Sequence, residues 1–295
     1  MNPWLDPICQ TEFERLVREG AGSQDIHDAR VSRGYAQISA GEDAFVAREQ
    51  ARVAAHQRAL CALLEQTIGP SPSILDVGCG TGGAAVAMAL SPRLAPKRVV
   101  GVDPSLLALR SADVRARGHG VASRMSFVQT IPDAPLPFHS DTFDLVVSVS
   151  VLEFIRTPAR RARLIQEMIR VTRPAGHLFV ATPTSFAWRE HHTGRFLGNQ
   201  IRRDGYPWAT SPWQLRKMLS DCEFVPLQCY FLDAAKRRLG VPWAALPERA
   251  FGWLPWVLPW QKVLVRKRHS RHSWNARQSR QSRDGRRALP RHDEQ

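Results

Sequence analysis

Long apolar stretches are absent from this sequence of 295 residues. No stretch reaches the roughly 18 uninterrupted apolar residues of a membrane-spanning helix, so we expect no such helix. The start, MNPWLDPICQTEFERL, has no basic segment followed by an apolar run, and we therefore expect no secretory signal. With 43% hydrophobic and 23% charged residues, the composition is typical of a globular chain that can form one large α/β domain with additions.

Cysteine is scarce, and its spacing excludes two kinds of small, cross-linked fold. There is no CxxC pair, which argues against a zinc site and against a disulfide framework. We therefore expect no metal site and a reducing, cytoplasmic location. The five cysteines are Cys9, Cys61, Cys79, Cys222 and Cys229.

Acidic residues are too few to balance the basic ones, and the formal net charge is +14. Half of this excess lies in residues 266–295, which carry ten Lys or Arg against three acids. We expect residues 269–295 to be a disordered basic tail, because this composition cannot bury a core. The tail is either simply solvated or a weak electrostatic tether to RNA or anionic lipid.

Strand-like and helix-like segments alternate through the middle of the chain. This alternation predicts a doubly wound parallel sheet with right-handed crossovers. After Pro183 the pattern becomes irregular, and residues 1–44 before it have the character of an N-terminal arm or lid. We expect helices at residues 45–68, 83–90, 105–118, 159–172 and 211–222, and strands at 74–77, 98–103, 125–130, 143–155, 174–183, 224–232 and 261–268, the fourth of which ends in a turn within its range.

A glycine-rich loop follows the first strand in the stretch SILDVGCGTGGAAVAMAL. Gly78, Gly80 and Gly83 satisfy G-x-G-x-x-G, and Asp103 follows about 20 residues later, a spacing also found in dinucleotide-binding proteins. Asp76, the extra glycine at position 82 and the lack of a second glycine fingerprint favour a different ligand. Small residues with an acid behind them suit a cationic adenosine that bears an amino acid.

The glycines, the helix that follows them and Asp103 can each contact such a ligand. Glycines let the backbone approach it closely, and the N–H groups of the following helix are available to a carboxylate. Asp103, at the end of the second strand, is placed to accept hydrogen bonds from both ribose hydroxyls.

Four motifs in this order resemble the class I S-adenosylmethionine-dependent methyltransferases, in the subgroup that acts on small molecules. They are ILDVGCGTGG, VVGVDPS, APLPFHSDTFDLVVSVSVLEF and VTRPAGHLFVATP. The resemblance covers residues 45–268. It implies an α/β, Rossmann-like doubly wound sheet of seven strands, with the last antiparallel and helices on both faces, and S-adenosyl-L-methionine as the cofactor.

The resemblance also assigns cofactor contacts. It implies that Asp103 holds the ribose and that the backbone of Val149 faces the methionyl group. Arg58 is either a partner of the cofactor carboxylate or an ordinary solvated charge on a helix. The further residues implied are Asp76, Gly78, Cys79, Gly80 and Gly82 beside the methionine and ribose, and Pro104 and Ser105 beside the adenine.

Two positions depart from the family pattern. The family often has an acid four residues before LPF, where this chain has Pro132. We expect Asp133, or the backbone of Thr130 and Ile131, to substitute near the adenine. The common LEH is here Leu-Glu-Phe, so a histidine that some relatives use as a base is missing at residue 154.

The acceptor site should come from the segments that interrupt the regular pattern. Methyl transfer to an oxygen of high pKa needs a general base near the methyl group. The candidates are His191, His192 and Tyr206, in an insert at residues 184–215 that several arginines make basic. A second insert, at residues 238–260, includes the tryptophans of WLPWVLPW, which pack over a core, form a lid over the substrate or make a peripheral membrane contact.

Together these patterns predict a cytoplasmic methyltransferase acting on a small, partly apolar acceptor, at oxygen. Nucleic acid is a weaker alternative, since the Asn/Asp-Pro-Pro-aromatic element of amino-methylating enzymes is missing after the fourth strand. A non-catalytic cofactor-binding partner or regulator, and more remotely a nicotinamide dehydrogenase, stay open.

Overall fold

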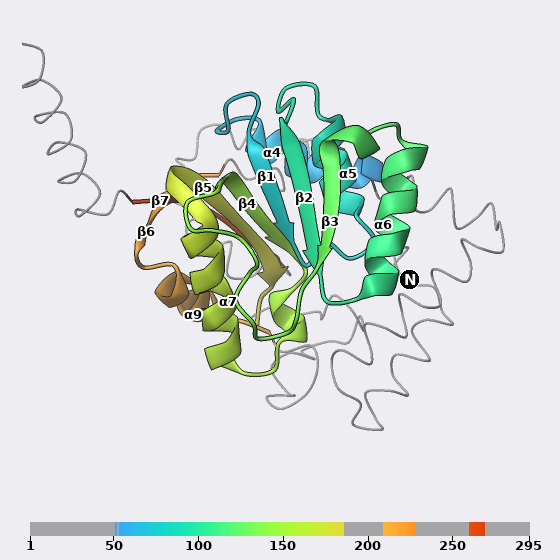
Figure 1. The fold of residues 1–295 in the computed structure, drawn as a ribbon. Helices are drawn as coiled ribbons and strands as arrows, with labels where there is room; N and C mark the ends of the chain where they lie inside the picture. Colours follow the sequence, from blue (N-terminus) through green and yellow to red (C-terminus); the bar gives the residue numbers. More distant parts are fainter. Residues whose placement is uncertain (1–50, 52, 186–208, 228–259, 269–295) are drawn as a thin grey trace, which may run out of the picture.

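The computed structural model describes residues 51, 53–185, 209–227 and 260–268 of the chain. These residues contain a seven-stranded sheet with helices on both faces (Figure 1). The strands are β1 (Ser73–Val77), β2 (Arg98–Asp103), β3 (Met125–Gln129), β4 (Phe143–Val149), β5 (Thr172–Pro183), β6 (Cys222–Val225) and β7 (Trp260–Lys267). The helices are η1 (Gln57–Cys61), α4 (Ala62–Leu64), α5 (Gly83–Leu90), α6 (Leu106–Gly118), η2 (Ala122–Arg124), η3 (Leu152–Phe154), α7 (Pro158–Val171) and α9 (Pro212–Met218).

The strand order across the sheet is β3-β2-β1-β4-β5-β7-β6. Strands β1 to β5 pair in parallel, and β7 runs antiparallel to both β5 and β6. The prediction of seven strands with the last antiparallel is therefore confirmed. The order reverses between β1 and β4, and a doubly wound sheet binds its ligands at the carboxyl ends of the strands beside such a reversal. In Figure 1 the arrowheads of β1, β2 and β4 lie at the same edge of the sheet.

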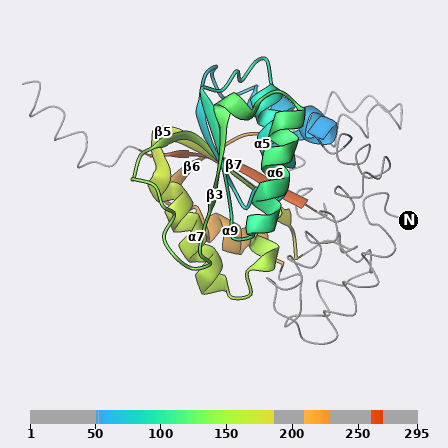
Figure 2. The same ribbon diagram turned by 45° about the vertical axis from the view of Figure 1, so that its right-hand side comes forward.

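Two apolar layers hold the helices against the sheet. Helices η1, α4 and α5 pack on one face, in a core that includes Leu64, Met88 and Phe179. Helices α7 and α9 cover the opposite face, where Ile165 and Leu215 pack. Figure 2 shows α5 and α6 on one side of the sheet and α7 and α9 on the other. The alanine-rich α5 is buried along nearly its whole length, because small side chains let it lie close to the strands.

Local signals set where the elements begin and end. Ser105 and Thr157 accept hydrogen bonds from the backbone at the starts of α6 and α7, and Ser211 forms a capping box at the start of α9. Strand β4 ends at Val149, because Ser150 adopts a left-handed backbone with φ 60° and η3 follows, so the predicted turn occupies the rest of residues 143–155. Strand β6 begins two residues before the predicted 224 and ends at Val225, and residues 228–232 lie outside the described residues.

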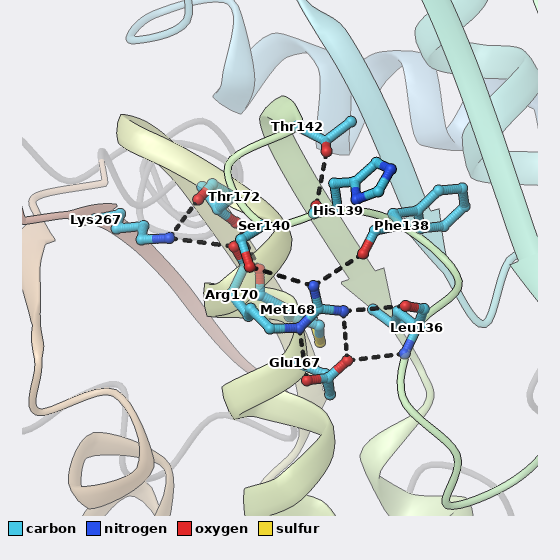
Figure 3. Close-up of polar contacts among 10 residues, drawn as sticks. All are labelled: Leu136, Phe138, His139, Ser140, Thr142, Glu167, Met168, Arg170, Thr172 and Lys267. Atoms are coloured by element: carbon cyan, nitrogen blue, oxygen red, sulfur yellow. Dashed lines mark hydrogen bonds and ion pairs between the residues drawn. The ribbon is translucent and has the colours of Figure 1, made fainter.

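Arg170 of α7 forms hydrogen bonds with the connection between β3 and β4. Its guanidinium donates to the carbonyl oxygens of Leu136 and Phe138, at 3.0 and 2.8 Å, and pairs with Glu167 (Figure 3). Lys267, at the end of β7, donates to the carbonyls of Arg170 and Thr172. The end of this connection, at Leu136 and Phe138, is thus bound to α7, and α7 is bound in turn to the end of β7.

No helix in the described part of the chain is long and apolar enough to cross a membrane.

Candidate cofactor site

The glycine loop joins the end of β1 to the start of α5 and adopts a backbone that favours glycine. Gly78, Gly80 and Gly82 have φ values of 72°, 51° and 79°, in the left-handed region. A Cβ at Gly78 would lie 2.3 Å from Val151 Cγ2, and one at Gly82 would lie 2.8 Å from Ala112 Cβ. The loop is therefore wedged between the turn after β4 and helix α6.

Gly80 differs from the other two glycines in what it faces. A Cβ built there meets no atom of the described residues within 4 Å, so this part of the loop has an open side within the described domain. Its N–H points to the next strand, where it donates to Asp103 Oδ2 at 3.0 Å. The loop thus presents bare backbone to a ligand on one side while a carboxylate holds it on the other.

Asp103, the last residue of β2, joins the loop to the start of α6. Its two carboxylate oxygens accept from the backbone N–H groups of Gly80, at 3.0 Å, and Ser105, at 2.9 Å. The side chain is buried, with 3% of its surface exposed. A carboxylate oxygen has more than one acceptor position, so these bonds orient the group and leave it able to accept from a pair of hydroxyls.

Asp76 lies behind the loop and is the second acid of the site. It is almost fully buried, and Oδ2 has no hydrogen-bond partner among the described residues. Burial, followed by the charge of Asp103, raises the pKa of this carboxyl from 3.8 to about 7, while a hydrogen bond from the Ala85 backbone opposes the rise. Two buried carboxyls beside an open glycine backbone fit a cationic ligand and would repel a pyrophosphate.

The cofactor contacts predicted around α6 and β4 lie beside this loop. Pro104 accepts from Gln129 Nε2 through its carbonyl, and the hydroxyl of Ser105 caps α6. Thr130 donates its backbone N–H to the carbonyl of Asp103, next to the loop. Val149 is the last residue of β4 and is half-buried.

For three other predicted contacts, the structure gives no interaction with the glycine loop among the described residues. Asp133 forms an ion pair with Arg160 of α7, and neighbouring Ile131 is 75% exposed. Arg58 lies on η1 and is exposed. Their roles toward the adenine and the cofactor carboxylate stay predictions.

Cys79 is part of the loop but packs away from the open side. A Cβ at Gly101 would lie 2.8 Å from its sulfur, so the thiol fills the space that this glycine leaves on β2. Burial raises the pKa of Cys79 well above its usual value, and the charges of Asp76 and Asp103 add to the effect. The thiol therefore stays protonated and is no nucleophile.

A basic group behind the loop was not anticipated. Arg115 of α6 donates to Thr81 Oγ1 at 3.2 Å, and its guanidinium and the ring of His56 both approach Gly83. Burial lowers the pKa of Arg115 to about 10, which still leaves it charged near neutral pH. Arg115 lies one helical turn after Ala112, which packs against Gly82, but that contact is visible only in the packed structure, so the sequence alone does not place Arg115 here.

The predicted bases His191, His192 and Tyr206 lie outside the described residues, as do residues 1–44, most of the two inserts and the tail. Among residues 51, 53–185, 209–227 and 260–268, no group of three or more His, Cys, Asp or Glu side chains could hold a metal ion.

Comparison with known proteins decides between the two ligands that the loop allows. Residues 75–180 match the family model described as "Methyltransferase domain". This part of the chain is a class I S-adenosylmethionine-dependent methyltransferase domain. The family uses S-adenosylmethionine, and the open glycine loop with its two buried carboxyls fits that cationic cofactor.

Named relatives share this domain across part of their length. A carboxy-S-adenosyl-L-methionine synthase of Yersinia pestis (strain Pestoides F) is 29% identical over 149 residues, which are 49% of this chain and 53% of that protein. The chain thus spans about half the length of the curated relatives it matches.

Solved structures confirm the fold of the methyltransferase domain. The [4+2]-cyclase SpnF is 20% identical, with a TM-score of 0.50 over 72% of this chain and 82% of that one. YcgJ from Bacillus subtilis is 19% identical, with a TM-score of 0.50 over 73% and 100%. At these identities the likeness shows the fold alone.

The raised pKa of Asp76 predicts a pH dependence of stability in the cofactor-free protein. Because the folded pKa, about 7, exceeds the ordinary 3.8, the folded state binds more protons between these pH values. The free energy of unfolding should therefore fall as pH rises through this window. Asp76→Asn should flatten that fall, as measured by denaturant unfolding at a series of pH values. The exposed Asp113→Asn is the matched control, and parallel profiles for wild type and Asp76→Asn would refute the assignment.

Proposed function

We propose that the whole chain is an S-adenosylmethionine-dependent methyltransferase that acts on a small, partly apolar acceptor, at oxygen. The observation that carries the proposal is the bond between Gly80 N–H and Asp103 Oδ2, which sets a ribose-binding carboxylate against the open face of the glycine loop. The matched methyltransferase domain supports it.

The sulfonium of the bound cofactor supplies an activated methyl group for in-line displacement. The chain's own contribution is to align and desolvate the two reactants. Asp103 and the loop backbone hold the adenosine end, and the turn after β4, at Ser150 and Val151, borders the methyl end. A base from the insert at residues 184–215 would accept the acceptor's proton, and His191, His192 and Tyr206 stay the proposed candidates.

Transfer of a radiolabelled methyl group tests this function. Purified chain would be incubated with S-[methyl-³H]adenosylmethionine and a panel of hydroxylated aromatic and aliphatic compounds, with Asp103→Ala run in parallel. We expect label in a base-stable methyl ether product with wild type and at least a tenfold lower rate with the variant. Binding of the cofactor without label in any product would refute the proposal and favour a non-catalytic partner.

A second candidate activity is a reaction that modifies the cofactor itself, because the curated relative is named a carboxy-S-adenosyl-L-methionine synthase. A new cofactor-derived product, formed without any acceptor and detected by mass spectrometry, would favour it. Nucleic acid stays a weaker acceptor, since the described segment after β4 reads SVLEF, without paired prolines. A cytoplasmic location, with peripheral membrane contact through residues 253–260 and the tail, stays a prediction.

A further inference from the structure

A cluster of buried polar side chains lies at the carboxyl end of β5, outside the cofactor contacts described above. Glu153, Thr182 and Thr210 have no exposed surface, and Gln261 is 5% exposed. Thr182 and Gln261 are cross-strand partners on β5 and β7, and Thr182 Oγ1 donates to Glu153 Oε2 at 3.2 Å. Burying these polar groups costs folding free energy unless each has a hydrogen-bond partner.

This cluster adjoins the glycine loop through the turn after β4. Val151 lies against Gly78, and Glu153 follows two residues later in η3. The backbone N–H of Ser150 donates to the carbonyl of Ala181, one residue before Thr182. The cluster therefore sits on the side of the loop where the methyl end of the cofactor would lie.

The orientation of the Gln261 amide is fixed by its surroundings. Nε2 donates to the carbonyl oxygen of Thr210, at 2.6 Å, and more weakly to that of Pro183, at 3.5 Å. Both neighbours are acceptors, so the amide cannot be turned over, and Oε1 must point away from them. Oε1 then has no hydrogen-bond partner among the described residues, and neither has the hydroxyl of Thr210.

Residues next to this cluster lie where both predicted inserts join the sheet. Thr184 and Thr210 are joined by a parallel bridge where the first insert leaves the sheet and returns. Gln261 comes directly after the second insert, at the start of β7. A ligand held at Gln261 and Thr210 would therefore contact the junction of both inserts with the cofactor domain.

We propose that Gln261 Oε1 and Thr210 Oγ1 form a hydroxyl-binding subsite that orients the methyl acceptor beside the cofactor. A hydroxyl group can donate to the amide oxygen and accept from the threonine hydroxyl, whereas a carbonyl or an ether oxygen can only accept. The subsite rests on the proposed function and narrows its acceptors to compounds that carry a free hydroxyl at this point.

Thr210→Val tests the subsite, because it removes the hydroxyl while keeping the shape of the side chain. The probes are phenol and toluene, which differ in that hydroxyl, titrated by ligand-detected saturation-transfer NMR in the presence of S-adenosylhomocysteine. We expect phenol to bind wild type and its dissociation constant to rise about tenfold in the variant, the loss of one hydrogen bond. Toluene binding should be unchanged. Absence of phenol binding to wild type, or equal phenol affinity in both proteins, would overturn the subsite.

Thermal unfolding separates ligand binding from a structural role. Thr172→Val, at the other end of β5, removes a hydroxyl that donates to the Met168 carbonyl at 2.7 Å, and it should lower Tm. Thr210→Val should leave Tm unchanged or raise it, and an equal drop in Tm would refute the subsite. Calorimetry with S-adenosylhomocysteine on the same samples tests the proposed function separately, because cofactor binding without phenol binding removes only the subsite.

Discussion

Replacing Asp103 by alanine is expected to weaken binding of S-adenosylhomocysteine, the methyl-transfer product, by about tenfold to a hundredfold. The substitution removes the carboxylate that would accept from the ribose hydroxyls. It also frees the backbone N–H groups of Gly80 and Ser105, which the carboxylate holds at 3.0 and 2.9 Å. The first effect removes hydrogen bonds to the ligand. The second loosens the loop in the free protein, so the loop must be ordered again when the ligand binds. Isothermal titration calorimetry gives the dissociation constants directly.

Two further variants separate these effects from a general loss of charge. Asp113→Ala removes an exposed acid of α6 that pairs with Arg117, and its affinity for the product should match wild type. Asp103→Asn keeps one oxygen acceptor but sets an amide N–H₂ against a backbone N–H, so its affinity should lie near that of the alanine variant. Wild-type affinity in Asp103→Ala, with the fold intact, would contradict the ribose assignment.

Gly78→Ala is expected to cause the largest combined loss, of stability and of cofactor binding. A left-handed backbone costs a non-glycine residue about 1–2 kcal/mol. The new methyl group would also lie 2.3 Å from Val151 Cγ2, and such overpacking costs about 1–3 kcal/mol more. Either the loop or the turn at Val151 must move to relieve the clash, and both border the cofactor site. Chemical denaturation should show the loss of stability, and calorimetry should show no measurable product binding.

A second substitution tests whether this clash is the cause. In Gly78→Ala/Val151→Ala the colliding Cγ atoms are absent, so part of the stability lost should return while the backbone cost remains. Gly118→Ala, at the end of α6, is the matched control, because a Cβ there meets no atom of the described part of the chain within 4 Å. A double variant no more stable than Gly78→Ala would show that Val151 is not the obstacle.

The sheet and the cofactor loop were predictable because their signals are local. Apolar runs such as ILDV read as buried strands, and the glycines with Asp76 and Asp103 mark the turn from β1 into α5. The antiparallel last strand came from resemblance to a family, because no spacing in the sequence gives the direction of β7. The residue at which β4 gives way to its turn was not predicted, since nothing in the sequence marks Ser150 as the residue with a left-handed backbone.

Groups brought together by tertiary contacts were not predictable. Arg115 reaches Thr81 because α6 packs on the loop, and only the packed helix shows which of its many charges turns inward. Gln261 and Thr210 are 51 residues apart in the chain, and the sheet register places one beside the other. Asp133, expected near the adenine, pairs with Arg160, a neighbour that α7 supplies from another part of the fold.

The central claim is that the glycine loop with Asp76 and Asp103 binds a cationic adenosine ligand. The most direct test is calorimetric titration of the wild-type chain with S-adenosylmethionine and, separately, with NAD⁺. The account predicts saturable binding of S-adenosylmethionine with a dissociation constant on the order of micromolar, and no detectable binding of NAD⁺. If the folded protein bound NAD⁺ and showed no binding of S-adenosylmethionine, the claim would be contradicted.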